Sequence, residues 1–336
     1  MRTMLDKLAK VGWPRVIAFD LFAFFTLIFA TILVADAVPR AAHKGTLIFA
    51  SAKRIAFSFD DVPRGPGGFL ALDDRPGLLI KALKEGGIKQ AAFFVNPGRI
   101  SGSNNGAASV AAYAAAGHVI ANHTANHRTV SSQSAQAFLA DVDAAEVWLK
   151  PQRNYRPWLR FPQLDEGGSN KMKRDAVRAG LKARGLRDGY VTADGWDWFM
   201  DARAREAVKA GRTIDKDALR VLFVETHLES ANFSDRLALR VLGRRPVQML
   251  LLHETDLATM YVADLARALR ADGWEIVPAD AVYADPMAKM QPDPDYADGT
   301  MLEMLAWEKR LHGNRWFPRN NPEEARRLFA TRVLRQ

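Results

Sequence analysis

Apolar runs and amphipathic stretches alternate along residues 53–283 of the chain. Short runs rich in Val, Ile, Leu and Phe predict buried strands, and longer stretches with apolar residues every three or four positions predict helices. The predicted strands are residues 55–59, 91–95, 118–121, 158–161, 190–192, 247–252 and 274–277. The predicted helices are residues 76–85, an alanine-rich segment that runs through Tyr113 and ends before Gly117, and residues 133–149, 171–184, 219–242 and 256–271.

This alternation indicates parallel strands joined by helical crossovers. The run Met-Leu-Leu-Leu at residues 249–252 suits a strand that is buried on both faces. About seven strand–helix units in roughly 230 residues favour a barrel over a smaller open sheet. The predicted fold class is therefore α/β, with a (β/α)7–8 barrel at residues 50–285.

The chain continues beyond the predicted barrel. Residues 286–298 are rich in proline and acidic side chains, which indicates a linker. Residues 323–335 have the pattern of a basic amphipathic helix, which we expect to pack on the barrel. Residues 286–336 are thus predicted to be a linker and a C-terminal helical extension.

The N-terminus has the pattern of a targeting segment. Basic residues precede an uncharged run at residues 21–35, and Ala35-Asp36-Ala37 offers small residues at the spacing that signal peptidase reads. Fifteen helical residues rise about 22 Å, less than the roughly 30 Å of a bilayer core. Residues 16–35 are long enough to span, with Asp20 inside the segment. Residues 1–37 are therefore either a signal peptide or a membrane anchor, and both predict an exported protein of the periplasm or cell envelope.

Composition excludes several kinds of site. The chain contains no cysteine, so disulfides, thiolate metal sites and cysteine nucleophiles are excluded. Its formal net charge is +9, but Lys and Arg are dispersed along the sequence rather than clustered with aromatic residues. We therefore expect no nucleic-acid partner. The sequence indicates no protein partner either.

Two segments carry most of the candidate chemistry. Asp60 and Asp61 directly follow a predicted strand, so their side chains should point in different directions. His123 and His127 are four residues apart, which lets both face one metal ion if the segment is helical or turn-like. One carboxylate, two imidazoles and a spare carboxylate are the components of a hydrolytic zinc site with an open position for water.

Three later segments could complete such a site. Arg160 follows a predicted strand and could hold the Asp60 carboxylate in its ionised form. Residues 194–198 combine two carboxylates with two indoles, a combination that suits sugar binding. His253 emerges from the apolar strand and is a candidate general acid. The remaining histidines are predicted to lie on solvated surfaces: His43, His118, His227 (flanked by Glu225 and Glu229) and His312.

The order and spacing of these segments resemble the polysaccharide deacetylases, the NodB-homology family also known as carbohydrate esterase family 4. The five matching segments are residues 58–61, 117–127, 160–163, 194–198 and 251–253, so the resemblance covers about residues 53–283. It implies a distorted, incomplete (β/α) barrel. It also implies a hydrolase that removes N-acetyl groups from a chitooligosaccharide, peptidoglycan or an exopolysaccharide.

The resemblance implies a role for each matching residue. Asp61, His123 and His127 would bind one divalent metal ion, most often Zn²⁺. Asp60 would be the general base and Arg160 its tether. His253 would be the general acid, with Asp194 or Asp197 setting its charge state. Leu251 and Trp198 would line the pocket for the acetyl methyl group, and the backbone N–H of Gln163 would bind the oxyanion.

Two departures from the family pattern leave the substrate open. Val62-Pro63 follows the aspartates in place of the usual glycine, which changes the lip of the groove. Gln163 replaces the usual aromatic residue, which removes a stacking surface for a sugar. An acetylated glycan remains the expected substrate. The alternatives are an O-acetyl ester, a non-sugar amide, or sugar binding without turnover.

Overall fold

The computed structural model describes residues 52–100 and 105–335. The chain from Ala50 to Gln336 forms one compact unit. The predicted signal peptide or anchor at residues 1–37 lies outside the described residues. Across the two described ranges, no helix combines the length and apolar character needed to cross a membrane.

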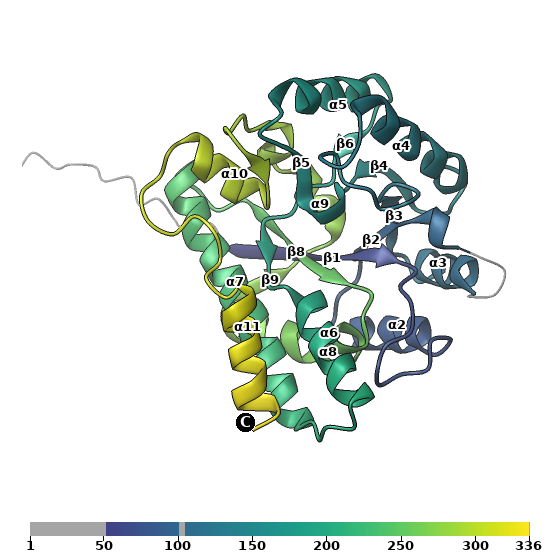
Figure 1. Cartoon of the computed structure of the whole chain (residues 1–336), viewed down its shortest axis with the longest axis vertical. Coiled ribbons are helices and arrows are strands. Elements are labelled where there is room, and N and C mark those ends of the chain that lie inside the picture. Colours follow the sequence, from purple (N-terminus) through teal and green to yellow (C-terminus); the bar gives the residue numbers. More distant parts are fainter. Residues whose placement is uncertain (1–51, 101–104, 336) are drawn as a thin grey trace, which may run out of the picture. The chain divides into compact units, whose positions relative to one another are not determined.

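The described residues form an α/β structure in which most strands alternate with helices (Figure 1). The strands are β1 (Lys53–Val62), β2 (Ala92–Val95), β3 (Val119–Asn122), β4 (Tyr155–Leu159), β5 (Asp165–Gly168), β6 (Arg187–Asp188), β7 (Ala193–Asp194), β8 (Val247–His253), β9 (Trp274–Ile276) and β10 (Ala297–Asp298). The α-helices are α2 (Arg75–Glu85), α3 (Gly106–Ala115), α4 (Ala135–Leu149), α5 (Lys171–Ala183), α6 (Asp197–Lys209), α7 (Lys216–Leu242), α8 (Asp256–Ala271), α9 (Ala279–Ala284), α10 (Met301–Glu308) and α11 (Pro322–Leu328). Short helical turns complete the list: η1 (Pro97–Arg99), η2 (Pro162–Leu164), η3 (Pro286–Lys289) and the π-helical η4 (Phe329–Val333).

One curled sheet forms the centre of this unit. Its strands follow the order β6-β4-β3-β2-β1-β8-β7, and β9 pairs with β1. All of these pairings are parallel. The two ends of the order, β6 and β7, are separated by only residues 189–192, so the backbone itself crosses from one edge of the sheet to the other. The prediction of an α/β barrel is confirmed, and the distortion lies at this crossing.

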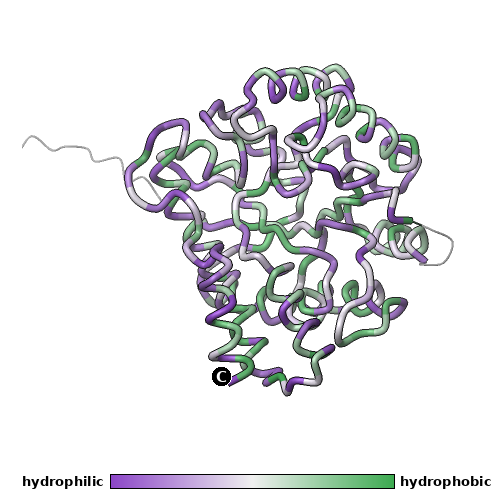
Figure 2. The backbone as a smooth tube through the Cα atoms, viewed as in Figure 1, coloured by the Kyte–Doolittle hydropathy of each residue, from purple (hydrophilic) through white to green (hydrophobic). Residues whose placement is uncertain are grey.

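The hydrophobic pattern explains why β1 and β8 are central. Along β1, Ile55, Phe57 and Phe59 belong to one core cluster, whereas Ala56 belongs to the cluster on the other face. Alternate residues of a strand point to opposite faces, so a strand with apolar residues at neighbouring positions fits between two cores. The hydropathy colouring shows hydrophobic residues along these strands (Figure 2).

Six of the seven predicted strands are confirmed within a few residues. The strand predicted at residues 190–192 is wrong, because these residues make the crossing between β6 and β7. Thr192 still interacts with β8, since its backbone N–H donates to the Met249 carbonyl at 3.0 Å. Its apolar neighbours Tyr190 and Val191 are buried as a strand would be, which explains the misleading pattern.

The segment beyond residue 286 packs against the barrel. β10 pairs antiparallel with β5, and α10 packs on α7. Met301, Leu302 and Leu305 of α10 are buried in the same core cluster as Ala56. These contacts bring residues 296–320 beside the loops that follow the barrel strands, where the candidate functional residues lie.

Candidate active site

The carboxyl ends of the parallel strands gather the residues that the sequence singled out. Asp60 and Asp61 lie near the carboxyl end of β1, and His123 and Arg160 directly follow β3 and β4. His253 ends β8 and is the register partner of Asp60 across the sheet. Loops at the carboxyl ends of strands are where barrels of this kind place their sites. The motifs, which are far apart along the chain, thus lie together at one site.

Asp61, His123 and His127 form a group that could hold a metal ion. One donor atom from each lies within 4.8 Å of the other two. Asp61 Oδ1 is 3.1 Å from His127 Nε2 and 3.9 Å from His123 Nε2. Ligands of a tetrahedral zinc ion with bonds of about 2.05 Å lie about 3.3 Å apart, so small movements would complete the geometry.

The protonation states of these three side chains also suit the binding of a metal cation. Burial lowers the pKa of His123 to about 3 and that of His127 to about 4, so both rings are neutral near pH 7 and offer lone pairs. His123 Nδ1 lies 2.9 Å from the Arg160 carbonyl, which accepts a hydrogen bond from Nδ1–H and leaves the Nε2 lone pair free to bind a metal. Burial alone would raise the pKa of Asp61, but His253 and the other neighbouring cationic groups hold it below its ordinary value. Two neutral imidazoles and one carboxylate fit a divalent metal such as zinc.

The loop between the two histidines is a turn rather than a helix. Thr124 and His127 have positive φ angles of 61° and 55°. The Asn122 side chain accepts a hydrogen bond from Thr124 N at 2.7 Å, and Thr124 Oγ1 accepts one from His127 N at 3.0 Å. These bonds fold the segment back so that both rings face Asp61.

Asp60 lies beside the metal-binding group and is 2% exposed. Its Oδ1 accepts a hydrogen bond from Arg160 Nη1 at 2.9 Å, and its Oδ2 lies 3.7 Å from His123 Nε2. Burial raises the pKa of Asp60 above its ordinary value, against the opposing charge of Arg160. Arg160 is itself held by the Gly189 carbonyl and lies over the Phe94 ring at 4.1 Å. The structure therefore brings Asp60 and its expected tether together.

His253 pairs with Asp197, not with Asp194. Asp197 Oδ1 is 2.8 Å from His253 Nδ1, and Asp197 Oδ2 accepts from the backbone N–H of His253 at 2.8 Å. Burial lowers the pKa of His253, but the Asp197 carboxylate outweighs it and raises the pKa above the ordinary value. Asp194 Oδ1 instead accepts from Trp196 N at 2.9 Å, and burial raises the pKa of Asp194 to about 7. The alternative that the sequence left open is resolved by this geometry.

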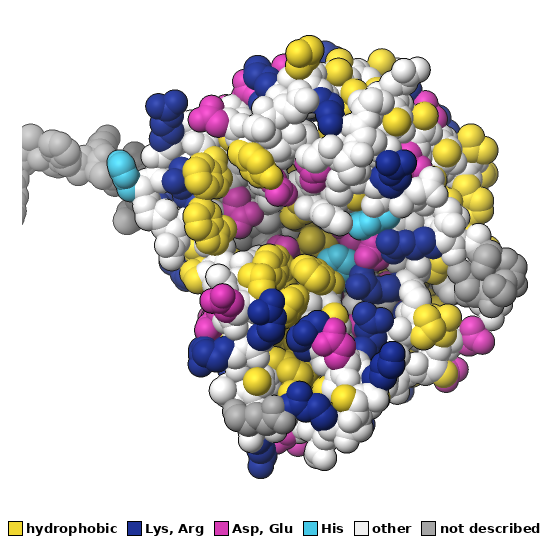
Figure 3. Space-filling view, in the orientation of Figure 1, with side chains coloured by type: hydrophobic (Ala, Val, Ile, Leu, Met, Phe, Trp, Pro, Cys, Tyr) yellow, Lys and Arg dark blue, Asp and Glu magenta, His cyan; other side chains and the backbone are white. Residues whose placement is uncertain are grey.

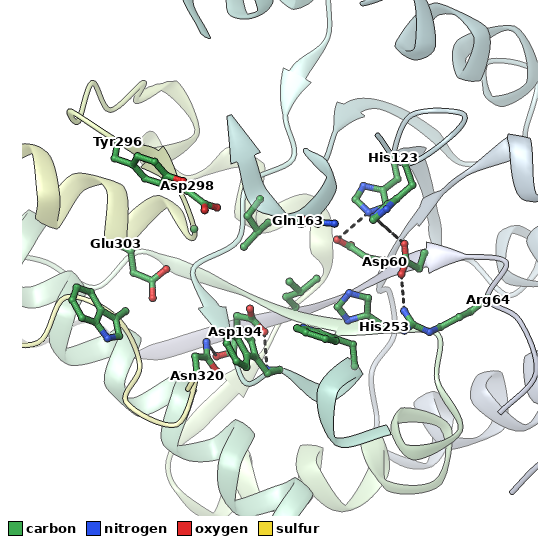
Figure 4. Close-up of a pocket in the computed structure, with 18 of the residues that line it drawn as sticks. Asp60, Arg64, His123, Gln163, Asp194, His253, Tyr296, Asp298, Glu303 and Asn320 are labelled. Atoms are coloured by element: carbon green, nitrogen blue, oxygen red, sulfur yellow. Dashed lines mark hydrogen bonds and ion pairs between the residues drawn. The ribbon is translucent and has the colours of Figure 1, made fainter. Parts of the chain in front are cut away.

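A cavity of about 760 Å³ joins these residues (Figure 4). Gln163, Trp198 and Leu251, expected to contact substrate, all line it. The opposite side of the cavity comes from the C-terminal extension, as the labelled residues of Figure 4 show. We call this side the distal wall, and its members are Tyr296, Asp298, Glu303, Trp307, Trp316 and Asn320.

Two arginines that the sequence did not single out bind the Asp61 carboxylate. Arg64 Nη1 donates to Asp61 Oδ2 at 2.6 Å, and Arg99 Nη1 lies 3.0 Å from Asp61 Oδ1. Arg64 directly follows Val62-Pro63 at the end of β1. Its backbone N–H donates to Glu254 Oε2 at 2.7 Å, which fixes the lip of the cavity.

Two of the predicted surface histidines are buried instead. His227 is fully buried on α7, and its Nδ1 lies 2.7 Å from the Phe223 carbonyl. His118 is 3% exposed and its Nδ1 accepts a hydrogen bond from Ala91 N at 3.2 Å. Both predictions of a solvated surface were wrong, because neighbouring elements cover these positions. His312 is exposed, and His43 lies outside the described residues.

Comparison with known proteins gives a family match and several distant structural likenesses. The peptidoglycan deacetylase PdaC from Bacillus subtilis is 17% identical, with a TM-score of 0.44, over 70% of this chain and 91% of that one. A family 4 acetyl xylan esterase from Clostridium thermocellum, solved with a cobalt ion, is 16% identical, with a TM-score of 0.44, over 69% of this chain and 91% of that one. BA3943, a pseudoenzyme of carbohydrate esterase family 4 from Bacillus anthracis, is 13% identical, with a TM-score of 0.44, over 69% of this chain and 66% of that one. The curated proteins gave no match.

The family match is more specific than these likenesses. Residues 50–183 match the polysaccharide deacetylase family model. This segment contains both aspartates of β1, both histidines of the metal-binding group and Arg160. Over residues 50–183, the chain is therefore similar to the polysaccharide deacetylase family.

Proposed function

We propose that the chain is a metal-dependent hydrolase that removes N-acetyl groups from an N-acetylated polysaccharide or oligosaccharide. The observation that carries the proposal is that one cavity is lined by three kinds of group: a set of side chains that could bind a metal ion, a buried carboxylate beside them, and a histidine paired with its own carboxylate partner. Hydrolysis of an amide needs all three, because its carbonyl is a poor electrophile and its nitrogen a poor leaving group.

Asp61, His123 and His127 are the proposed ligands of one divalent metal ion, which we take to be Zn²⁺. When bound, such an ion polarises the acetyl carbonyl and lowers the pKa of a water molecule. Asp60 is the proposed general base, because it is buried beside His123 and its carboxylate is oriented by Arg160. The pKa of Asp60 is raised above its ordinary value, which suits a carboxylate that must accept a proton during the reaction and release it afterwards.

The departing amine needs a proton, and His253 is the proposed donor. Burial opposes the charged ring, but the Asp197 carboxylate raises the pKa of His253 above its ordinary value, so the ring keeps its proton to a higher pH than a free imidazole would. Gln163 lies on the loop after Arg160 with a φ of 58°, and we assign its backbone N–H to the developing oxyanion. Leu251 is 4% exposed and lines the cavity, which suits contact with the acetyl methyl group.

We further propose that the body of the protein works outside the cytoplasm, since residues 1–37 have the pattern of a signal peptide or anchor. The expected glycan substrate is compatible with this location. No nucleic-acid or protein partner is needed for the proposed reaction.

Acetate release from a panel of acetylated compounds tests the function. The panel contains N-acetylglucosamine oligomers, peptidoglycan fragments and acetylated xylan, each with Zn²⁺ or with a chelator. The proposal expects chelator-sensitive acetate release from an N-acetylated glycan. Acetate release from acetylated xylan alone would show that the substrate is an O-acetyl ester rather than an N-acetyl amide. No acetate release from any compound by the zinc-loaded protein would contradict the assignment as a hydrolase.

A further inference from the structure

The exposed aromatic side chains of the described residues gather in one place. Ten large hydrophobic side chains are exposed in this part of the chain, and four of them are aromatic. These four are Trp198, Tyr296, Trp307 and Trp316, with exposed fractions of 36%, 59%, 41% and 52%. All four line the cavity that contains the candidate metal-binding group. Figure 3 shows hydrophobic side chains gathered on one side of the hollow in which histidines are visible.

Large apolar side chains left in water in this way indicate a binding surface. Three of the four belong to the distal wall, which comes from the C-terminal extension rather than from the barrel. Gln163 stands where the family has an aromatic residue near the reacting centre, so the chain lacks that stacking surface. The distal wall supplies aromatic surface at the other side of the same cavity.

The distal wall is held in place before any ligand binds. β10 pairs with β5, directly after Gln163 and Leu164. Gly299 N donates to the Leu164 carbonyl at 3.2 Å, and Met301 N donates to the Val191 carbonyl at 2.9 Å. Asn320 Nδ2 donates to the Asp194 carbonyl at 3.1 Å. Preorganised surfaces bind with a smaller loss of conformational entropy.

The chemistry of the wall fits a pyranose chain. The Trp307 and Trp316 rings are stacked with an interplanar angle of 9° and centroids 5.8 Å apart, and Arg315 lies over Trp307 at 3.6 Å. The face of an aromatic ring carries partial negative charge, which attracts the partially positive C–H bonds of a sugar ring. Asp298, Glu303 and the Asn320 side chain add acceptors for hydroxyl groups at the same wall.

The sign of the charge narrows the class of sugar. Five carboxylate side chains line the cavity, against two nearby arginines: Arg64, which is paired with Asp61, and Arg315, which lies over the Trp307 ring. Asp298 and Glu303 place two of these carboxylates on the distal wall itself. A uronic acid or phosphate on this wall would be repelled. A neutral or amine-bearing sugar would not.

Resting on the proposed function, we propose that the distal wall binds the neutral or amine-bearing sugar units that continue from the residue being deacetylated. The C-terminal extension would thus make the chain selective for oligomers over single sugars, and for neutral or amino glycans over acidic ones.

The test measures binding and turnover separately. Binding of chitotetraose and of a tetrameric oligouronate is measured by calorimetry on the full chain carrying Asp60→Asn, which removes turnover. To this background we add Trp307→Ala with Trp316→Ala, or Asp298→Asn with Glu303→Gln. Met172→Ala is the control, because Met172 is 82% exposed on α5 and does not line the cavity. Thermal unfolding identifies any variant that is not folded.

We expect the double tryptophan variant to bind chitotetraose about 5- to 150-fold more weakly, while Met172→Ala binds normally. The double amide variant should shift the affinity ratio towards the oligouronate. In the chain with Asp60 intact, the tryptophan changes should raise KM for chitotetraose and leave its kcat nearly unchanged. Unchanged chitotetraose binding by the folded tryptophan variant, or an unchanged ratio in the amide variant, would overturn the inference. Absence of acetate release by the unmutated chain would contradict the proposed function instead, and the binding measurements would still stand.

Discussion

The pairing of His253 with Asp197 predicts the effect of one substitution on the pH dependence of the reaction. Asp197 accepts from both Nδ1 and the backbone N–H of His253, each at 2.8 Å, and it is fully buried. Asp197→Asn keeps the shape of the side chain but removes its charge. The protonated form of His253 then loses its main electrostatic support.

The magnitude follows from the kind of bond that is lost. A hydrogen bond to a charged group contributes about 1.5–3 kcal/mol, and 1.36 kcal/mol corresponds to about one pKa unit. The pKa of His253 should therefore fall by about one to two units. A general acid works while it is protonated, so activity is present below this pKa and is lost as the pH rises through it. Asp197 raises the pKa of His253 above 6.5, so in a plot of kcat against pH the unmutated chain should lose activity only above pH 6.5. We call this part of the plot the alkaline limb.

The assay is kcat for acetate release from an N-acetylated oligosaccharide between pH 5 and pH 10, with Zn²⁺ present. We expect the alkaline limb of Asp197→Asn to move about one to two units lower, with kcat about 10- to 100-fold lower on the alkaline side. Asp194→Asn is the matched control, because Asp194 bonds Trp196 N and does not contact His253. An unmoved limb in Asp197→Asn, or an equal shift in Asp194→Asn, would refute the reasoning.

Three further substitutions test other parts of the site. Asp60→Asn should lower kcat about 10²- to 10⁴-fold while the metal content stays near one ion per chain, and loss of metal would disprove the assignment of Asp60 as base. His127→Ala removes one of three ligands, so its metal content after dialysis should fall well below one ion per chain; full retention would show that another residue binds the metal. Gly195→Ala would place a methyl carbon 2.7 Å from His227 Cδ2, so we expect a loss of about 1–3 kcal/mol in unfolding free energy, measured by urea unfolding. Normal stability in that variant would mean that the His227 ring moves without cost.

Much of the site could be predicted because it depends on local order along the chain. Asp60, His123, Arg160 and His253 each follow a strand that is visible as an apolar run. In a parallel sheet, the carboxyl ends of such strands meet at one edge, so residues far apart in sequence could be placed together. Strand pairing then brings such residues together, as in the register of Asp60 with His253.

The choice between Asp194 and Asp197 depends on a detail that periodicity does not contain. Trp196 has a positive φ of 54°, which turns the chain between the end of β7 and the start of α6. That turn directs Asp197 towards His253 and leaves Asp194 bonded to the loop itself. A single backbone angle at a non-glycine residue is not apparent from the sequence.

The distal wall could not be predicted for a different reason. It depends on pairing between β5 and β10, which are more than a hundred residues apart. Residues 286–298 lack the length and apolar character of a core strand, so they resemble a linker. The available signal was the presence of Tyr296, Trp307 and Trp316 in the C-terminal extension, since aromatic residues that are exposed often mark a binding surface.

His227 was misjudged because α7 is covered on several sides. Charged neighbours at positions 225 and 229 indicated a solvated face. In the structure, Arg319 pairs with both glutamates, at 2.6 Å and 2.8 Å, and α8, α10 and η4 pack around the helix. A long helix enclosed by other elements does not keep one apolar stripe, so its pattern gives little information about burial.

The central claim is that Asp61, His123 and His127 bind one metal ion on which deacetylation depends. The most direct test removes metal from the full chain with a chelator and titrates Zn²⁺ back while acetate release from chitotetraose is measured. The account predicts that the chelated chain is inactive and that activity is restored with a break at one Zn²⁺ per chain. Acetate release by the metal-free chain, or a restored rate that is unaffected by His123→Ala, would contradict it.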